Sequence, residues 1–135
     1  LMTVGADLLL KTLYKLQMGE LQPIKQDDSL SNYAPLLKKE TGLIDWNKSA
    51  RELHNLIRGL YGGARAGKFK IWLSRVAEGI SLEPAEIKID GQKFFVGTGD
   101  GVLEILEIQA PNSKKLNAAD FLRGNKVGDG FWTTE

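Results

Sequence analysis

The chain has 135 residues, of which 42% are hydrophobic, and carries a net charge of +1. These values fit one domain with one modest core and an appendage. The chain has no cysteine and a single histidine, which excludes disulfides, thiolate nucleophiles and histidine-rich metal sites. It also contains no signal-peptide pattern and no apolar run near the roughly 20 residues of a membrane helix, so we expect a cytoplasmic protein that does not enter a membrane.

The first part of the chain predicts a helix followed by a linker. Thr3 can cap a helix over residues 3–18, along which apolar side chains recur at three-to-four spacing. Gly19 is a suitable end for this helix. We expect its wide apolar arc to pack on something upstream or on the later domain. Residues 21–41 are polar, aperiodic and interrupted by prolines, as is typical of a linker.

The central block of the chain, residues 38–75, is basic. It holds nine basic and three acidic side chains, whereas residues 76–110 hold seven acids and two lysines. Such a block is typical of a surface that binds a polyanion. The other interpretation is a solvated surface on which opposite charges mingle once the chain has folded.

A second helix is predicted inside this block. Ser49 opens a capping box, and the apolar residues after it share one stripe, while Arg51 and Arg58 lie two turns apart away from it. Trp46, just before the cap, is expected in the core. His54 borders the stripe without a partner acid or nucleophile, so we expect it to be structural.

The segment after this helix predicts β-structure. Residues 61–67 are rich in glycine, and we expect a flexible connector that contains Arg65. Residues 102–109 form a strand whose apolar phase shifts between Ile105 and Leu106, which predicts a bulge or burial on both faces. Alternation of apolar and polar residues predicts three further strands, at 69–74, 87–90 and 94–98.

The glycine-rich run at 97–101 has the composition of a phosphate-binding loop but not its context. Such loops need a helix N-terminus directly after them, because aligned N–H groups hold the phosphate. Here a strand follows. We therefore expect a tight β-turn.

The end of the chain predicts a last short helix, which starts at Asn117 and ends at Gly124. Four or five strands with one helix before and one after predict a mainly β fold with flanking helices. We expect a small, partly open, OB-like β-barrel, preceded by a helix and a linker. The expected boundaries are 1–20 for the terminal helix, 21–42 for the linker, 43–127 for the barrel and 128–135 for the tail.

Several motifs are specific in combination and in their order along the chain. They are Tyr33-Ala34-Pro35 with the lysines after it, Ile44-Asp45-Trp46, the run from Ser49 to Leu60, Lys70-Ile71-Trp72, the run from Gly97 to Gly101, and Lys114-Lys115 through Asp120. Together they resemble the C-terminal part of the methionyl-tRNA formyltransferase family. Residues 2–20 resemble the last helix of that family's catalytic domain. The resemblance implies formyl transfer from 10-formyltetrahydrofolate to methionyl initiator tRNA, with catalytic Asn, His and Asp residues on an N-terminal Rossmann-like domain. It also implies that the linker and the C-terminal barrel hold the tRNA.

This chain departs from the family in two places. The catalytic domain is missing, and because the chain starts at Leu1 rather than Met, we expect it to be a piece of a longer protein. His54 lies on the wrong element to replace the catalytic histidine. Where the family has Asn-Pro-Trp-Pro after the helix, this chain has the shorter and looser loop that begins at Tyr61. We expect no catalytic residue, metal or cofactor in this chain, and no activity without the missing domain.

The predicted function is therefore to position methionyl initiator tRNA for formylation in translation initiation, as a monomer. Phosphate contacts fix register and orientation but carry no sequence information, so we expect recognition of shape. The alternative is a docking or oligomerisation domain of another formyltransferase-family protein. The residues predicted to contact tRNA phosphates are Lys38, Lys39, Arg51, Arg58, Arg65, Lys68, Lys114 and Lys115.

Overall fold

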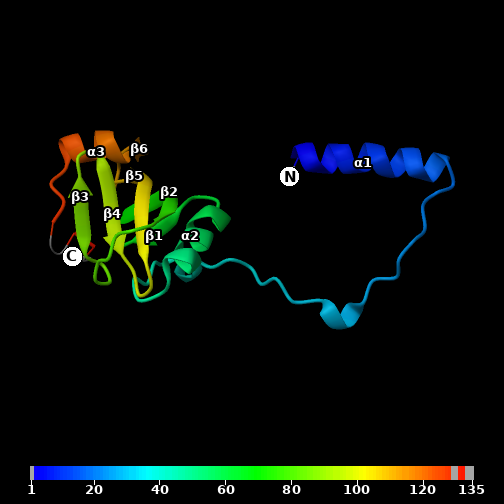
Figure 1. Cartoon of the computed structure of the whole chain (residues 1–135), viewed down its shortest axis with the longest axis horizontal. Coiled ribbons are helices and arrows are strands. Elements are labelled where there is room, and N and C mark those ends of the chain that lie inside the picture. Colours follow the sequence, from blue (N-terminus) through cyan, green and yellow to red (C-terminus); the bar gives the residue numbers. More distant parts are fainter. Residues whose placement is uncertain (1, 129–130, 133–135) are drawn as a thin grey trace. The chain divides into compact units, whose positions relative to one another are not determined.

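Figure 1 shows the chain as a computed structural model, which describes residues 2–128 and 131–132. The chain divides into two compact units, residues 1–35 and residues 36–135. The second unit therefore begins inside the segment that was expected to be a linker.

The first unit contains one long helix, α1 (Met2–Gln17), and one turn of 3₁₀ helix, η1 (Asp28–Leu30). The chain leaves α1 through hydrogen bonds from the Gly19 and Glu20 amides to carbonyls of the last turn, at 3.1 and 3.0 Å. The predicted helix is thus confirmed to within a residue. None of its described residues is buried. No helix in the described part of the chain has the length and apolar character that crossing a bilayer requires.

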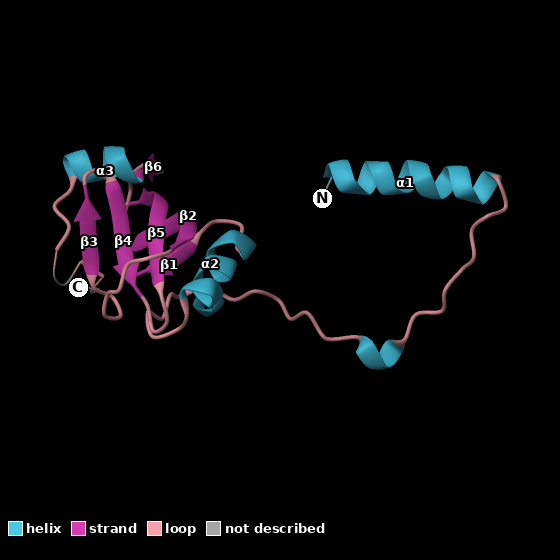
Figure 2. Ribbon diagram, in the orientation of Figure 1, coloured by secondary structure: helices cyan, strands magenta, loops and turns pink. Residues whose placement is uncertain are grey.

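The second unit is a six-stranded antiparallel sheet flanked by helices (Figures 1 and 2). Its elements are η2 (Lys39–Gly42), α2 (Ala50–Gly59), β1 (Ala64–Ala66), β2 (Phe69–Ala77), β3 (Ile87–Asp90), β4 (Lys93–Gly97), β5 (Val102–Gln109), β6 (Leu116–Asn117) and α3 (Ala118–Gly124). The strand order is β1-β2-β5-β4-β3, and β6 pairs with β5. Among the described residues β1 and β3 remain edges, so the sheet is not closed. The predicted mainly β fold with flanking helices is confirmed, and it is consistent with a small, partly open barrel.

Two details of the sheet bear on the sequence predictions. Leu106 is skipped in the β2–β5 register, because Ser74 faces Ile105 and Leu73 faces Glu107. The predicted bulge is therefore confirmed. The prediction of a flexible connector over 61–67 is wrong for its second half. There β1 pairs with β2, and a strand of three residues is too short to show an alternating pattern.

The core lies between the sheet and the two short helices. Helix α2 buries Ala50, Leu53 and Ile57, as its predicted stripe requires, and Trp46 is also buried. Both predictions are confirmed. The core residues from the sheet and α3 are Ala64, Ala66, Phe69, Ile71, Phe94, Val96, Leu103, Ile105, Ile108, Ala118 and Phe121.

The expected tail contributes two aromatic rings to this core. Phe131 stacks on Phe69 with ring centroids 4.2 Å apart, and Trp132 lies 4.9 Å from Trp46. No local pattern in the sequence marks these two residues, because an aromatic near a chain end has no periodic neighbours to assign it to a face.

The run at 97–101 forms the predicted turn and docks on the start of α2. The Thr98 amide donates to the Gly101 carbonyl at 3.1 Å, which closes the turn. The Gly99 amide donates to the carbonyls of Trp46 and Lys48 at 2.8 and 2.9 Å. A Cβ at Gly99 would lie 1.9 Å from the carbonyl oxygen of Asn47, so the close approach requires glycine. The glycines therefore serve packing.

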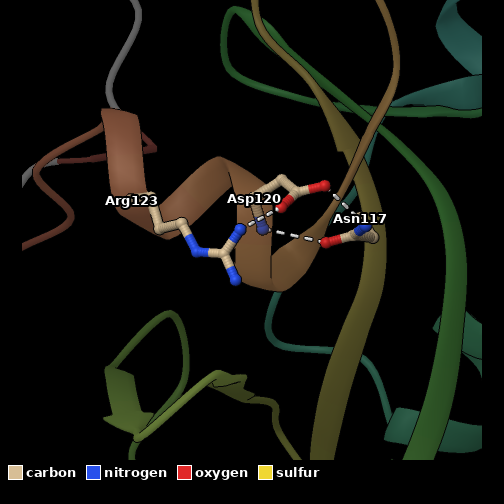
Figure 3. A network of polar contacts seen from close by, with 3 residues as sticks. All are labelled: Asn117, Asp120 and Arg123. Carbon is tan, nitrogen blue, oxygen red and sulfur yellow. Dashed lines mark hydrogen bonds and ion pairs between the residues drawn. The ribbon is translucent and has the colours of Figure 1, made fainter.

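Helix α3 begins with a polar network that Figure 3 shows. The Asn117 Oδ1 atom accepts from the Asp120 amide at 2.8 Å, which caps the helix as predicted. The Asp120 carboxylate accepts from Asn117 Nδ2 at 2.8 Å and from Arg123 Nη1 at 2.7 Å. All three residues are exposed. Their hydrogen bonds all lie within the cap and first turn of α3, so the network stabilises the start of this helix.

The capping box of α2 is complete. Ser49 Oγ accepts from the Glu52 amide at 3.3 Å, and Glu52 Oε2 accepts from the Ser49 amide and hydroxyl at 3.1 and 2.7 Å. Two hydrogen bonds lower the pKa of Glu52 below its ordinary value. The bond from the Ser49 hydroxyl has the larger effect and the bond from the Ser49 amide the smaller one. The ionised carboxylate is thus favoured by folding.

We expect Ser49→Ala to lower the free energy of unfolding by about 1 kcal/mol at neutral pH, and by less in acid. Because the folded pKa of Glu52 is depressed, its stabilisation is present above the unfolded pKa and is lost as the pH falls through the folded pKa. Urea denaturation at about pH 7 and about pH 3 measures both values. Ser49→Thr keeps the hydroxyl and should resemble the unsubstituted chain. An equal loss at both pH values would show that the hydrogen bonds of the Glu52 carboxylate contribute nothing to the free energy of unfolding.

Candidate nucleic-acid interface

An open hollow with basic walls lies beside β1 in the second unit. Its volume is about 310 Å³. Four of its lining side chains are cationic and one is aromatic, and no acidic side chain lines the described part of it. The residues that line the hollow are Leu37, Lys38, Lys39, Gly42, Leu60, Tyr61, Gly62, Gly63, Arg65 and Lys70.

The hollow forms because the chain before α2 attaches to β1. The Ile44 amide donates to the Arg65 carbonyl at 2.8 Å, and Leu43 and Arg65 form an isolated parallel β-bridge. The 3₁₀ turn η2 directly precedes this attachment and carries Lys38 and Lys39 to the same edge. Backbone pairing thus joins cations from two separate stretches of the sequence.

Two glycines let the loop after α2 lie against β2. Gly62 and Gly63 have φ angles of +113° and +76°, which L side chains rarely adopt. A Cβ at Gly63 would lie 2.8 Å from the Ile71 carbonyl oxygen and 3.3 Å from the Trp72 ring. This is the loop in which the sequence departs from the family pattern, and it places Tyr61 at the hollow.

The positive charge of the hollow is not compensated within the described residues. Arg65 and Lys70 stand directly opposite each other across β1 and β2, an arrangement in which like charges repel. The ion pairs in the part of the chain that the structure describes are Arg75–Glu104, Lys115–Glu107 and Arg123–Asp120. None of them uses a cation of the hollow. An anion bound there would therefore relieve repulsion as well as gain attraction.

A tryptophan lies next to the hollow on the outer face of β2. Trp72 is partly buried, and its Nε1 donates to Gln109 Oε1 at 2.9 Å. The Nζ atoms of Lys70 and Lys115 lie 6.0 and 5.5 Å from its ring centroid. Lys115 also pairs with Glu107 at 2.8 Å, so its charge is partly balanced. The Trp72 ring is thus near both Lys70, which lines the hollow, and Lys115, which does not.

The structure brings together only part of the predicted set of cations. Lys38, Lys39 and Arg65 line the hollow, and Lys115 lies beside Trp72. The other four are exposed but do not line the hollow as the structure describes it: Arg51 and Arg58 on α2, Lys68 between β1 and β2, and Lys114 before β6.

Sequence reasoning missed three residues of this region, Lys70, Tyr61 and Trp72. The alternation of β2 was a usable signal for two of them, because Ile71 is buried and its neighbours Lys70 and Trp72 must then face outward. No pattern marked Tyr61.

The single histidine of the chain lies outside the hollow. His54 Nδ1 lies 3.2 Å from Ser74 Oγ, so this histidine joins α2 to β2, as a structural role requires. Across the described residues no group of three or more acidic or histidine side chains is placed to hold a metal ion. The four cations that line the hollow give it a positive charge that would attract an anion.

Fold and site together define a small antiparallel β-domain with a cationic hollow beside its edge strand β1. Residues 36–126 match the family described as formyl transferase, C-terminal domain. The chain belongs to this family.

Individual relatives agree with that assignment. The chain is 42% identical over 134 residues to a methionyl-tRNA formyltransferase of Pelobacter propionicus, covering 95% of this chain and 42% of the relative. It is 43% identical over 136 residues to the one of Trichlorobacter lovleyi, covering 94% and 42%. The chain thus spans less than half the length of these curated relatives. Among solved structures, the HypX protein of Aquifex aeolicus superimposes with a TM-score of 0.60 at 20% identity, over 89% of this chain and 24% of HypX, which shows a shared fold.

Proposed function

We propose that this chain is the tRNA-binding module of a methionyl-tRNA formyltransferase. In this proposal it holds methionyl initiator tRNA, as a monomer, while a catalytic domain outside these residues transfers the formyl group from 10-formyltetrahydrofolate. The names of the curated relatives support the reaction. The chain by itself would then bind tRNA without formylating it.

The observation that carries the proposal is the uncompensated charge of the hollow. Lys38, Lys39, Arg65 and Lys70 line one concave surface without an acid among the described lining residues. Phosphate contacts supply most of the affinity of nucleic-acid binding and make it depend on salt. For Lys115, and for Arg51, Arg58, Lys68 and Lys114, contact with phosphates elsewhere on the tRNA stays part of the proposal.

A salt titration of tRNA binding tests this function. Fluorescence anisotropy of the whole chain with labelled initiator tRNA and with an elongator tRNA measures affinity between low and physiological salt. We expect the logarithm of affinity to fall linearly with the logarithm of salt, with a similar slope for both tRNAs, because phosphate contacts do not read sequence. An affinity that does not respond to salt would overturn the proposal.

We expect Lys38→Ala to weaken binding of both tRNAs to a similar degree and to reduce the salt slope by about one unit, because one phosphate contact is lost. The same titration measures both quantities. Lys88→Ala is the matched control, because Lys88 is also exposed but lies on β3, at the opposite edge of the sheet. If the slope stays unchanged, Lys38 is not among the contacts.

A docking or oligomerisation role is the second candidate, and α1 is the observation that favours it. Its large apolar side chains are all exposed, with Leu8, Leu9 and Leu10 each more than half accessible. Analytical ultracentrifugation separates the candidates. A tight dimer together with salt-insensitive tRNA binding would favour the second candidate over the first.

A further inference from the structure

Tyr61 is an aromatic side chain that does not pack in the core of this domain. It is completely exposed, at 108% of the reference accessibility, although aromatic rings gain most when they are buried. It stands directly before Gly62 and Gly63, of which Gly63 lies close to β2, and it lines the hollow beside the cations. The ring is thus presented to solvent beside the four cations of the hollow.

From this arrangement we infer that the hollow takes an unpaired nucleotide of RNA, with its base stacked on Tyr61 and its phosphates on the surrounding cations. The inference rests on the proposed tRNA binding and names the part of the RNA that enters the site. Grooves that bind single strands combine these two features, cations along the backbone and an aromatic ring for each base.

An unpaired base fits the site better than a paired one. A base inside a helix is covered on both faces by its neighbours, whereas an unpaired base can stack on a protein ring. The hollow has a volume of about 310 Å³, at the low end of the roughly 300–1,000 Å³ of small-ligand sites. It therefore has room for a single nucleotide and excludes a duplex from its interior.

The cations and the Tyr61 ring contribute to the affinity for RNA in two separable ways. Lys38, Lys39, Arg65 and Lys70 supply attraction that depends on the number of phosphates and on salt. Stacking on Tyr61 depends on an accessible base and is independent of its identity, because every base has a π-face. Loss of the ring should therefore change affinity for unpaired RNA without changing the salt slope.

The test compares two RNA probes with equal numbers of phosphates. One is a single strand with 2-aminopurine at its centre, and the other is a blunt-ended duplex of two strands without unpaired nucleotides. We expect Tyr61→Ala to weaken binding of the single strand by about 5- to 100-fold, to leave binding of the duplex within about twofold, and to abolish the change in 2-aminopurine fluorescence. Tyr61→Phe keeps the ring and should behave like the unsubstituted chain. Tyr14→Ala, which removes an exposed tyrosine from α1, is the matched control.

The outcomes separate this inference from the proposed function. Salt-dependent tRNA binding by the unsubstituted chain, with the single strand bound equally by the chain and by Tyr61→Ala, would overturn the inference alone. The same holds for equal losses on both probes. If the unsubstituted chain binds neither tRNA nor the probes in a salt-dependent manner, both the inference and the proposed function fail.

Discussion

Replacing Lys38, Lys39, Arg65 and Lys70 together by alanine is expected to weaken tRNA binding by about two to three orders of magnitude at physiological salt. Each phosphate contact contributes roughly 0.7–0.9 units to the salt slope, so four contacts account for about three units. These cations share one concave surface, and none pairs with an acid in the described part of the chain. Their effects should therefore accumulate on one bound polyanion.

Fluorescence anisotropy over a range of salt measures both the affinity and the slope. The control removes the same amount of charge from exposed lysines outside the hollow, by alanine at Lys11, Lys15, Lys88 and Lys93. This control should reduce affinity slightly, through the net charge, and leave the slope nearly unchanged. Equal losses in both variants would mean that binding follows net charge and that the hollow is not a site.

Gly99→Ala is expected to destabilise the second unit by about 4–6 kcal/mol. The new Cβ would lie 1.9 Å from the Asn47 carbonyl oxygen and 2.6 Å from its carbon. Both are backbone atoms, so the turn must move away from the start of α2. That movement breaks the bonds from the Gly99 amide to Trp46 and Lys48 and the one from Ala50 to Asp100. Three bonds at about 1 kcal/mol each, with about 1–3 kcal/mol of overpacking, set the range.

Urea denaturation followed by tryptophan fluorescence measures this loss, since Trp46 is in the core. The control is Gly59→Ala in the last turn of α2, where a Cβ meets nothing within 4 Å. That change should be neutral or slightly stabilising, because alanine favours helix over glycine. A loss below about 1 kcal/mol for Gly99→Ala would mean that the turn can shift without losing its bonds to α2.

Local chemistry explains which parts of the fold the sequence predicts. The capping residues Ser49 and Asn117 act on amides three residues away, so their motifs are complete within one turn of helix. The bulge at Leu106 is visible because the strand pattern changes phase there. The short strand β1 was missed, since three residues carry no period.

The candidate site was predicted less completely, and for a different reason. Of its residues, Lys38, Lys39 and Arg65 could be chosen as cations in a basic block, but Arg51 and Arg58 met the same criterion and lie outside the hollow. Charge in a sequence identifies candidates without grouping them, because every exposed position accepts a charge.

The sequence alone determined the caps, the turn at 97–101, most of the strands and the supply of cations, since each depends on residues within a few positions of one another. Only the tertiary structure decided which cations meet, because pairing of Ile44 with Arg65 joins segments that are distant along the chain. It also decided that Trp132 packs against Trp46 and that Tyr61 is left outside the core. Such contacts depend on the packing of the whole domain, which no local pattern records.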